Sequence, residues 1–236
     1  MFRHSGKKRT FRHNMRIASL LSFVAGIVNV AGFLSIQQLT TNVTGHFAFF
    51  VDEVFRWNFW GSLVFFLYIF FFLLGSFVSN MIVEIISKLN DKPSYRTPII
   101  IESIILLLVA TFGQKLIYTH ADFIACVLLF TMGLQNSLVT KISKATVRTT
   151  HLTGLFTDLG IELSQLFFYK LPEQKKKLLS SIKLRLTIIS FFFLGGFLGG
   201  ILYSSLQLNI LAIAAAFLLF GLIYDEIRLK IARFNH

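Results

Sequence analysis

The sequence has little of several residue types on which chemistry depends. It contains one cysteine, Cys126, which excludes an intramolecular disulfide and a multi-cysteine metal site. It also lacks the HExxH, GxSxG and phosphate-loop motifs of catalytic and nucleotide-binding sites, and its six histidines form no cluster along the chain. The sequence therefore predicts a protein that is not an enzyme and that holds no cofactor and no metal.

What the chain has instead is long apolar runs. The mean hydropathy is +0.70, 28 of 236 residues are Phe, and only 14% are charged. A membrane-spanning helix needs about 20 consecutive apolar residues, and these runs are continuously apolar, whereas barrel strands alternate. We therefore predict an all-α integral membrane protein. The six expected spans cover residues 17–37, 59–86, 98–117, 122–141, 186–206 and 208–225.

The basic residues are distributed unevenly between the predicted connections. Of 23 Lys and Arg, 21 fall in the two terminal segments and in the connections 88–97 and 141–185, whereas only Arg56 and Lys115 lie in the others. Basic residues are retained on the cytoplasmic side, so both termini are predicted to be cytoplasmic. We expect residues 1–16 to form a basic cytoplasmic tail before an uncleaved first helix, rather than part of a cleaved signal peptide. The net charge of +12 then indicates orientation and lipid contact, and no nucleic-acid partner.

A polar stretch occurs twice and indicates an internal duplication. TTNVTGHFAFFVDE (residues 40–53) matches TTHLTGLFTDLGIE (149–162) at an offset of 109. Upstream, GIVN at Gly26 matches GLQN at Gly133, and downstream FFLLGSFVS at Phe71 matches FFFLGGFLG at Phe191. Blocks that recur in the same order predict two repeats. Repeat 1 covers 17–117, repeat 2 covers 118–229, and 230–236 is a short cytoplasmic tail.

Three spans in each repeat predict that the second copy crosses the membrane upside down. The charges agree, because residues 38–58 carry one basic residue and their counterpart, 141–185, carries nine. Inverted repeats are the architecture of many secondary transporters. The short helices after the polar stretches are expected to be re-entrant or interfacial. The alternative is an eight-span protein with parallel repeats.

Two segments carry a resemblance to a known family. MGLQNSLVTKISKATVRTTHLTGLFTDLG (132–160) and its weaker echo GIVNVAGFLSIQQLTTNVTG (26–45) resemble the YoaK-like family of uncharacterised multi-pass bacterial membrane proteins. The resemblance covers nearly the whole chain. It implies about six spans and the bacterial plasma membrane, with no established activity. Members often carry an acid at the position of Asn29, which argues against a proton-coupling role for this amide.

The two polar stretches are the candidate solute-binding site. We name residues 40–45 the first break and residues 149–154 the second break. A polar break at membrane depth needs protein or a water-filled cavity to satisfy its backbone. Thr44 and Thr153 are predicted to cap, or nearly cap, helices that start at Gly45 and Gly154, whose free N–H groups would attract an anionic or carbonyl group. The candidate residues of the breaks are Thr40, Thr41, Thr44, Gly45, Thr149, Thr150, Thr153 and Gly154. The alternative is that these residues only cap and pack helices.

Polar residues elsewhere in the repeats add further candidates. The mid-span amides Asn29 and Asn136 could line a solute path or bond between helices. Glu53, Glu162 and Asp158 are candidates for proton or ion coupling, because ionisable groups in a membrane are costly. If their helices lie at the interface, these acids are merely solvated.

Small residues recur at helical spacing in two of the predicted spans. Glycine and serine faces allow tight helix crossing within one chain or in a homodimer. They are formed by Gly75 and Ser79, and by Gly195, Gly196, Gly199 and Gly200. Glu102, one turn after Pro98, is interpreted as a favourable charge at a helix start. Taken together, the sequence predicts a transporter or channel-like permease for a small polar or anionic solute, and the alternative is a membrane scaffold.

Overall fold

The fold is helical throughout the part of the chain that the structure describes. The computed structural model describes residues 10–90, 95–143 and 146–234. The elements are α1 (Phe11–Ile36), α2 (Val43–Phe55), α3 (Phe59–Asn90), α4 (Arg96–Ser143), α5 (Leu152–Phe168), α6 (Pro172–Leu206), the 3-10 turn η2 (Gln207–Asn209) and α7 (Ile210–Phe234). The predicted all-α class is confirmed.

Four helical segments of the described chain are long and apolar enough to cross a membrane. They are Phe11–Ile36, Phe59–Leu89, Arg96–Ser143 and Pro172–Ile227. Two of these segments have room for two crossings each. At 1.5 Å per residue, the 48 residues of α4 would extend about 72 Å, more than twice the ~30 Å of a hydrocarbon core.

Both long segments are interrupted where the sequence predicts a connection. α4 has non-helical backbone angles at His120 (φ −140°, ψ 50°), between the predicted spans 98–117 and 122–141. Between α6 and α7, Gln207 adopts a positive φ of 50° beside η2. The four segments therefore accommodate the predicted count of six spans, and the count itself stays a prediction.

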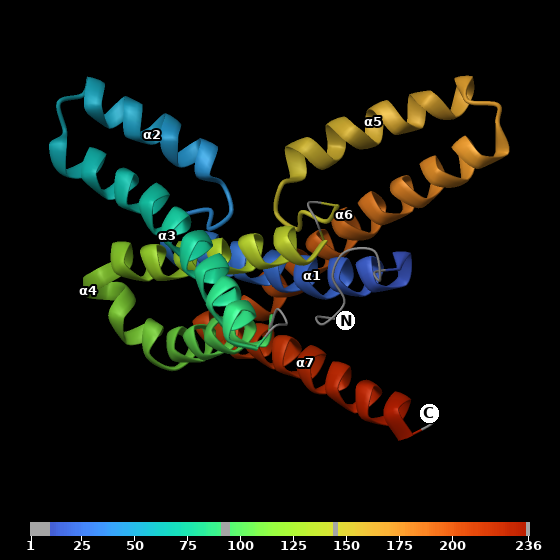
Figure 1. Cartoon of the computed structure of the whole chain (residues 1–236). Coiled ribbons are helices and arrows are strands. Elements are labelled where there is room, and N and C mark those ends of the chain that lie inside the picture. Colours follow the sequence, from blue (N-terminus) through green and yellow to red (C-terminus); the bar gives the residue numbers. More distant parts are fainter. Residues whose placement is uncertain (1–9, 91–94, 144–145, 235–236) are drawn as a thin grey trace.

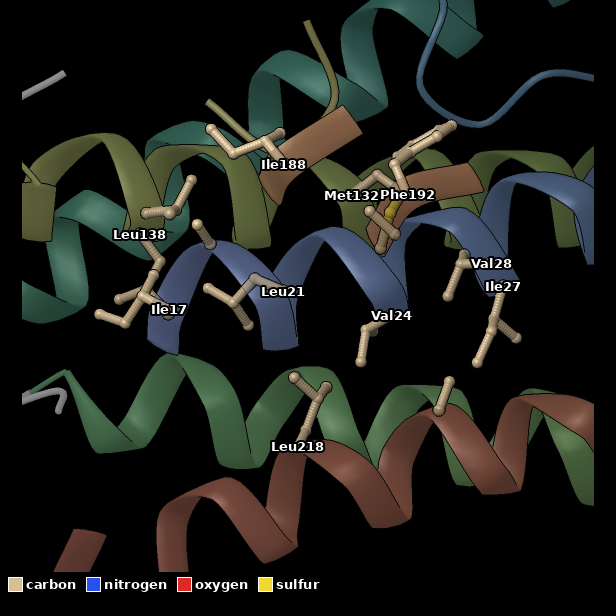
Figure 2. Packing of buried hydrophobic residues seen from close by; sticks show 14 of the residues in the cluster. Ile17, Leu21, Val24, Ile27, Val28, Met132, Leu138, Ile188, Phe192 and Leu218 are labelled. Atoms are coloured by element: carbon tan, nitrogen blue, oxygen red, sulfur yellow. The ribbon is translucent and has the colours of Figure 1, made fainter. Parts of the chain in front are cut away.

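Helix α1 occupies the centre of the core. It packs against α6, α7 and both halves of α4. Figure 2 shows Leu21 and Val24 of α1 between two pairs of helical segments. On one side lie α6 and the second half of α4, and on the other lie α7 and the first half of α4. The buried face of α1 is rich in small residues, among them Ala18, Ala25 and Gly26, which allow the neighbouring backbones to approach closely.

Two helix crossings depend on glycine in the same way. A Cβ atom at Gly26 would lie 2.2 Å from the Phe192 carbonyl oxygen, and one at Gly195 would lie 2.0 Å from that of Phe23. These residues join α1 to α6. The crossing of α3 with α4 has the corresponding contacts: 2.1 Å from Gly133 to the Phe72 oxygen and 2.0 Å from Gly75 to the Phe130 oxygen. At all four positions any larger residue would meet backbone.

The predicted glycine faces are thus used inside the single chain. Gly199 and Gly200 also face α1, where a Cβ would meet Ile27 at 3.3 Å and Val30 at 3.7 Å. Ser79 is fully buried. The alternative use of these faces, in a homodimer, remains a prediction.

Helices α2 and α5 form two hairpin arms with the helices that follow them. In Figure 1 the α2–α3 arm and the α5–α6 arm diverge from the centre of the molecule, while the start of α1 and the end of α7 lie on the same side. At 13 and 17 residues, α2 and α5 would be about 20 and 26 Å long, shorter than a hydrocarbon core. Helix α6 begins at Pro172, fourteen residues before the predicted span at 186, because its first turns pair with α5.

Candidate functional site

Each break is tied to the preceding helix by the same pair of side chains. The Thr41 hydroxyl donates a hydrogen bond to Oδ1 of Asn29 (2.9 Å), and the Thr150 hydroxyl donates to Oδ1 of Asn136 (2.7 Å). The sequence marks all four residues as candidates, and the structure brings them together in pairs. A half-buried amide that accepts from a hydroxyl satisfies part of its hydrogen-bonding capacity and fixes the direction in which the chain leaves the helix.

The three threonines of each break have matching environments. Thr40 and Thr149, which open the breaks, are fully buried, whereas Thr44 and Thr153, inside the following helices, are exposed. The second threonine of each break, which makes the bond to asparagine, is half-buried. Asn42 and His151, which precede the helices, are exposed as well.

The predicted helix starts are wrong by two residues. Helix α2 begins at Val43 with Asn42 as its N-cap, and the Gly45 N–H donates to Oδ1 of Asn42 (3.1 Å). Helix α5 begins at Leu152 with His151 at the N-cap position. Thr44 and Thr153 therefore lie in the first turn and do not cap. Asparagine is a better N-cap than threonine, which explains the shift in α2.

Glycine leaves room for the side chain at the N-cap position of both helices. A Cβ atom at Gly45 would lie 2.5 Å from Nδ2 of Asn42, and one at Gly154 would lie 2.5 Å from Nδ1 of His151. The capping-position side chain folds over the helix start and needs the space that a side chain at the glycine would fill. This close approach explains why glycine stands at this position in both breaks.

The two breaks differ in how their buried threonine is satisfied. Gln135 donates to the Leu21 carbonyl oxygen (2.9 Å) and to the Thr149 hydroxyl (3.4 Å). Val28 stands at the corresponding position of repeat 1 and cannot form such a bond. The Thr40 hydroxyl is buried without a hydrogen-bond partner.

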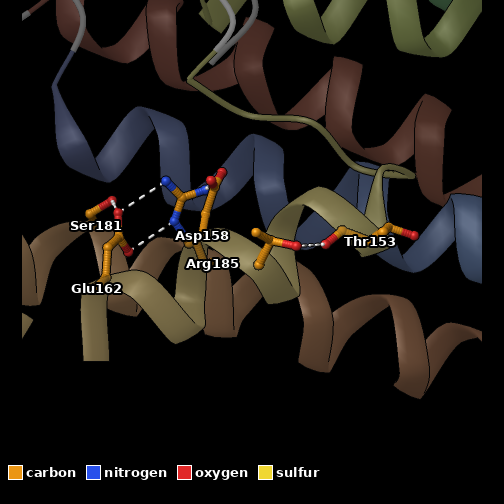
Figure 3. Close-up of polar contacts among 6 residues, drawn as sticks. Thr153, Asp158, Glu162, Ser181 and Arg185 are labelled. Carbon is orange, nitrogen blue, oxygen red and sulfur yellow. Dashed lines mark hydrogen bonds and ion pairs between the residues drawn. The ribbon is translucent and has the colours of Figure 1, made fainter. Parts of the chain in front are cut away.

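Both repeated glutamates accept hydrogen bonds from residues that follow their own helix. Glu162 of α5 accepts from the Ser181 hydroxyl (2.6 Å) and from Arg185 (2.9 Å), whose guanidinium also pairs with Asp158 (2.8 Å), as Figure 3 shows. Glu53 of α2 accepts from Nδ2 of Asn58 (2.6 Å), just before α3. All three acids are thus engaged in contacts that hold the arms, and their role in coupling stays a prediction.

A polar cavity of about 350 Å³ lies beside the second break. It is lined by Thr146, Arg148, His151, Gly154, Leu155, Asp158, Ser181, Leu184 and Arg185. Arg185 already faces two carboxylates, so Arg148, together with the amino-terminal end of α5, supplies the positive character that remains. The lining therefore carries two arginines, Arg148 and Arg185, and one carboxylate, Asp158. Among the described residues no group of three or more His, Cys, Asp or Glu is placed to hold a metal ion.

Comparison with known proteins identifies the family. The model of the family described as "Protein of unknown function (DUF1275)" matches residues 17–224. The chain belongs to the DUF1275 family. It is also 25% identical over 183 residues to the UPF0700 transmembrane protein YoaK of Bacillus subtilis (strain 168), covering 76% of this chain and 79% of that protein. No solved structure matches the chain. The expected family resemblance and the membrane location are confirmed.

This DUF1275 member has a row of three contacting polar side chains, His46, Tyr68 and Asp122, that the sequence did not predict. His46 of α2 is 2% exposed, its Nε2 lies 2.9 Å from the Leu39 carbonyl oxygen, and its ring packs edge-on against Tyr68 at 5.2 Å. The Tyr68 hydroxyl donates to Oδ1 of Asp122 (2.5 Å). In repeat 2 the position of His46 is taken by Leu155, so this row of polar side chains is present in repeat 1 and has no counterpart in repeat 2. A histidine where the repeat has leucine is the signal that could have revealed it.

The prediction that Glu102 provides a favourable charge at a helix start is wrong. Helix α4 begins at Arg96, so Glu102 lies beyond the first turn, where a favourable interaction with the helix dipole fades. The side chain is fully buried, and neither carboxyl oxygen has a hydrogen-bond partner.

Proposed function

We propose that the protein is a carrier or channel-like pathway that moves a small polar or anionic solute across the bacterial plasma membrane. Its two repeats, 17–117 and 118–229, would each cross three times in opposite orientation, with a short re-entrant or interfacial helix, α2 or α5, in each. The observation that carries the proposal is that each repeat contributes one helix to each of the two glycine crossings.

The two glycine crossings are copies of each other. Gly26 corresponds to Gly133, and Phe192, on which Gly26 packs, corresponds to Phe72, on which Gly133 packs. The first helix of each repeat therefore crosses the second helix of the other repeat. A two-fold rotation that places each repeat on the other would also place one glycine crossing on the other. With three spans in each repeat, such an axis lies in the membrane plane.

The breaks are mechanically linked to these crossings. Asn29 lies three residues after Gly26, and Asn136 three residues after Gly133, so each threonine–asparagine bond is one helical turn from a glycine contact. A rocking of one repeat against the other would move both breaks together. Alternating access in inverted-repeat carriers is a motion of this kind.

The cavity at the second break supports an anionic solute. Its volume of about 350 Å³ is at the lower end of small-molecule sites. Arg148 and His151 stand at its edge, beside the free N–H groups of the first turn of α5. In the proposed orientation this cavity faces the cytoplasm, because the connection 141–185 carries nine basic residues.

The orientation of the chain ends supports the same topology. The start of α1 and the end of α7 point to one side in Figure 1, and the α5–α6 arm extends to that side as well. The α2–α3 arm, with Arg56 as its only basic residue between 38 and 58, extends to the opposite side. Both termini would then be cytoplasmic.

A thermal-shift screen tests the proposal. The purified protein is melted in the presence of inorganic anions, organic acids, amino acids, nucleobases and simple cations, beside the double variant Thr44→Ala/Thr153→Ala. A ligand at 100 times its Kd stabilises the folded state by about 2.7 kcal/mol. We expect an anion to stabilise the wild type and to enter proteoliposomes that contain it. Loss of the stabilisation in the double variant would place the anion at the exposed threonines, and its retention would place it in the cavity, whose lining contains neither of these threonines.

A matched control separates binding from folding. The exposed Thr111 bonds only within its own helix, to the Leu107 and Leu108 carbonyl oxygens. The variant Thr111→Ala should keep any ligand shift. If no compound stabilises the wild type, or if an anion binds without flux, the transport proposal is wrong.

A membrane scaffold is the second candidate function, and one observation favours it. Thr41 and Thr150 are already satisfied by Asn29 and Asn136 and need no solute. On this reading the breaks only direct the chain. The double variant would then melt as the wild type does, and no compound in the screen would change either.

A further inference from the structure

Glu102 is the buried acid whose surroundings differ most from those of the other carboxylates. Its side chain is fully buried in the first half of α4, and neither Oε1 nor Oε2 has a hydrogen-bond partner. Its helical neighbours Ile99 and Leu106 are fully buried and apolar. The adjacent Ser103 hydroxyl donates to the Ile99 carbonyl oxygen (2.8 Å) and not to the acid.

The charged groups on the neighbouring elements do not neutralise Glu102. On α7, Glu226 pairs with Arg96, and Asp225 has a contact of its own. On α1, Arg16 lies over the Tyr224 ring (5.9 Å from its centre). The remaining titratable groups of the described parts of α1, α3 and α4 are Arg12, His13, Tyr68, Glu84, Lys88, Lys115, Tyr118, His120, Asp122, Cys126 and Lys141, and Tyr95 precedes α4; none of them bonds to either oxygen of Glu102.

A carboxylate in this position would be a charge shielded from solvent, with no hydrogen bond and no ion pair to the residues that the structure describes. Such a charge is far more costly to bury than the neutral acid, and the group takes up a proton instead. The other acids differ in this respect. Glu53 and Glu162 are hydrogen-bonded, and Glu84 pairs with Lys141 (2.5 Å) at an exposed position.

We propose that Glu102 is a proton-binding site within the membrane domain. In the conformation seen here the side chain is a neutral carboxylic acid. Its O–H bond breaks only when water reaches the site; the proton then passes to that water and a carboxylate remains. Glu102 lies six residues into α4, about 9 Å along the helix axis from Arg96, so the shortest route for the proton leads to that end of the helix.

This site names the coupling ion of the proposed carrier. The coupling role of Glu102 rests on the proposed function, whereas its protonation does not. It also transfers the coupling role from Glu53 and Glu162, whose carboxylates accept hydrogen bonds, to an acid whose oxygens accept none.

The test is carbodiimide labelling of the full-length wild type at neutral pH. Dicyclohexylcarbodiimide enters apolar regions and modifies a carboxyl group only in its protonated form. Peptide mass mapping should find the label on Glu102 and no label on Glu84, the exposed and ion-paired control. Absence of label on Glu102 under conditions that label added apolar carboxylic acids would overturn the assignment.

An infrared measurement gives a second and independent readout. The C=O stretching band of a protonated carboxylic acid should be present in the wild type, lost in Glu102→Gln and retained in Glu84→Gln. If the band persists in Glu102→Gln, the proposal is wrong. Because the labelling uses the wild type, it decides the question even if Glu102→Gln fails to fold. Neither measurement involves solute flux, so a labelled Glu102 in a protein without transport would refute the proposed function alone.

Discussion

Replacing Gly26 with alanine tests the close crossing of α1 and α6 directly. The added Cβ would lie 2.2 Å from the Phe192 carbonyl oxygen, whereas real Cβ atoms essentially never come within 3.0 Å of another atom. The difference between 3.0 and 2.2 Å requires the two backbones to separate by at least 0.8 Å. No side chain can rotate to relieve the contact, because the atom it meets belongs to the main chain.

The expected cost follows from this displacement. Overpacking a core costs typically 1–3 kcal/mol, and a contact with backbone belongs at the upper end, at about 3 kcal/mol. For a chain of this size that corresponds to a fall in Tm of roughly 6–12 °C. Thermal unfolding of the purified variants in detergent measures it.

A matched control and a symmetry test accompany the substitution. Gly160, on the exposed side of α5, has no atom within 4 Å of an added Cβ. Gly160→Ala should therefore be neutral or stabilising by up to about 1 kcal/mol through helix propensity. Gly133→Ala should cost as much as Gly26→Ala, because its Cβ would lie 2.1 Å from the Phe72 oxygen. If Gly26→Ala melts like Gly160→Ala, the helices do not cross in this way. If Gly133→Ala costs far less, the two crossings are not copies.

Two further predictions concern His46 and the orientation of the arms. Burial lowers the pKa of His46 below 6.5, against a smaller opposite effect of the hydrogen bond to the Leu39 carbonyl. The unfolded chain then binds the proton more tightly than the folded protein does, so the free energy of unfolding is at its full value above pH 6.5 and falls as the pH drops through the folded pKa of His46. His46→Leu should remove this loss of stability. If Tm falls equally with pH in the wild type and in His46→Leu, the prediction is wrong. In a cysteine-free background, a membrane-impermeant thiol reagent applied to intact cells should label Arg56→Cys and not Lys175→Cys, and labelling of both or of Lys175→Cys alone would reject the proposed inverted orientation.

The sequence carries enough information to predict the helical membrane class, because apolar run length and continuity are local properties. The positions of the connections could be predicted for the same reason, and the break in α4 falls at His120, between two predicted spans. The helix starts were harder, since Asn42 and Thr44 are both acceptable caps by type. Only the observed bond from the Gly45 N–H to Asn42 decides between them.

Contacts between distant segments could not be predicted in this way. The interpretation of Glu102 used its distance from Pro98, whereas burial on α4 depends on helices that pack against it from elsewhere in the chain, namely α1, α3 and α7. Arg185 was placed outside a span that was expected to start at 186. The signal for the earlier start is present at Pro172 and Glu173, since proline and an acid are favoured in the first turn of a helix.

The repeats agree in their packing and differ in their polar chemistry. The glycine crossings and the threonine–asparagine bonds occur in both halves with nearly equal geometry. In contrast, Gln135 stands where repeat 1 has Val28, and His46 stands where repeat 2 has Leu155. A duplicated scaffold needs the first set of features to keep its halves packed. The second set is not needed for packing, because the other half packs without it, so these polar residues are where the two ends of the molecule can carry out different steps. In the proposed carrier, one end faces the cytoplasm and the other the exterior, and the chemistry that distinguishes the two is found in these unequal positions.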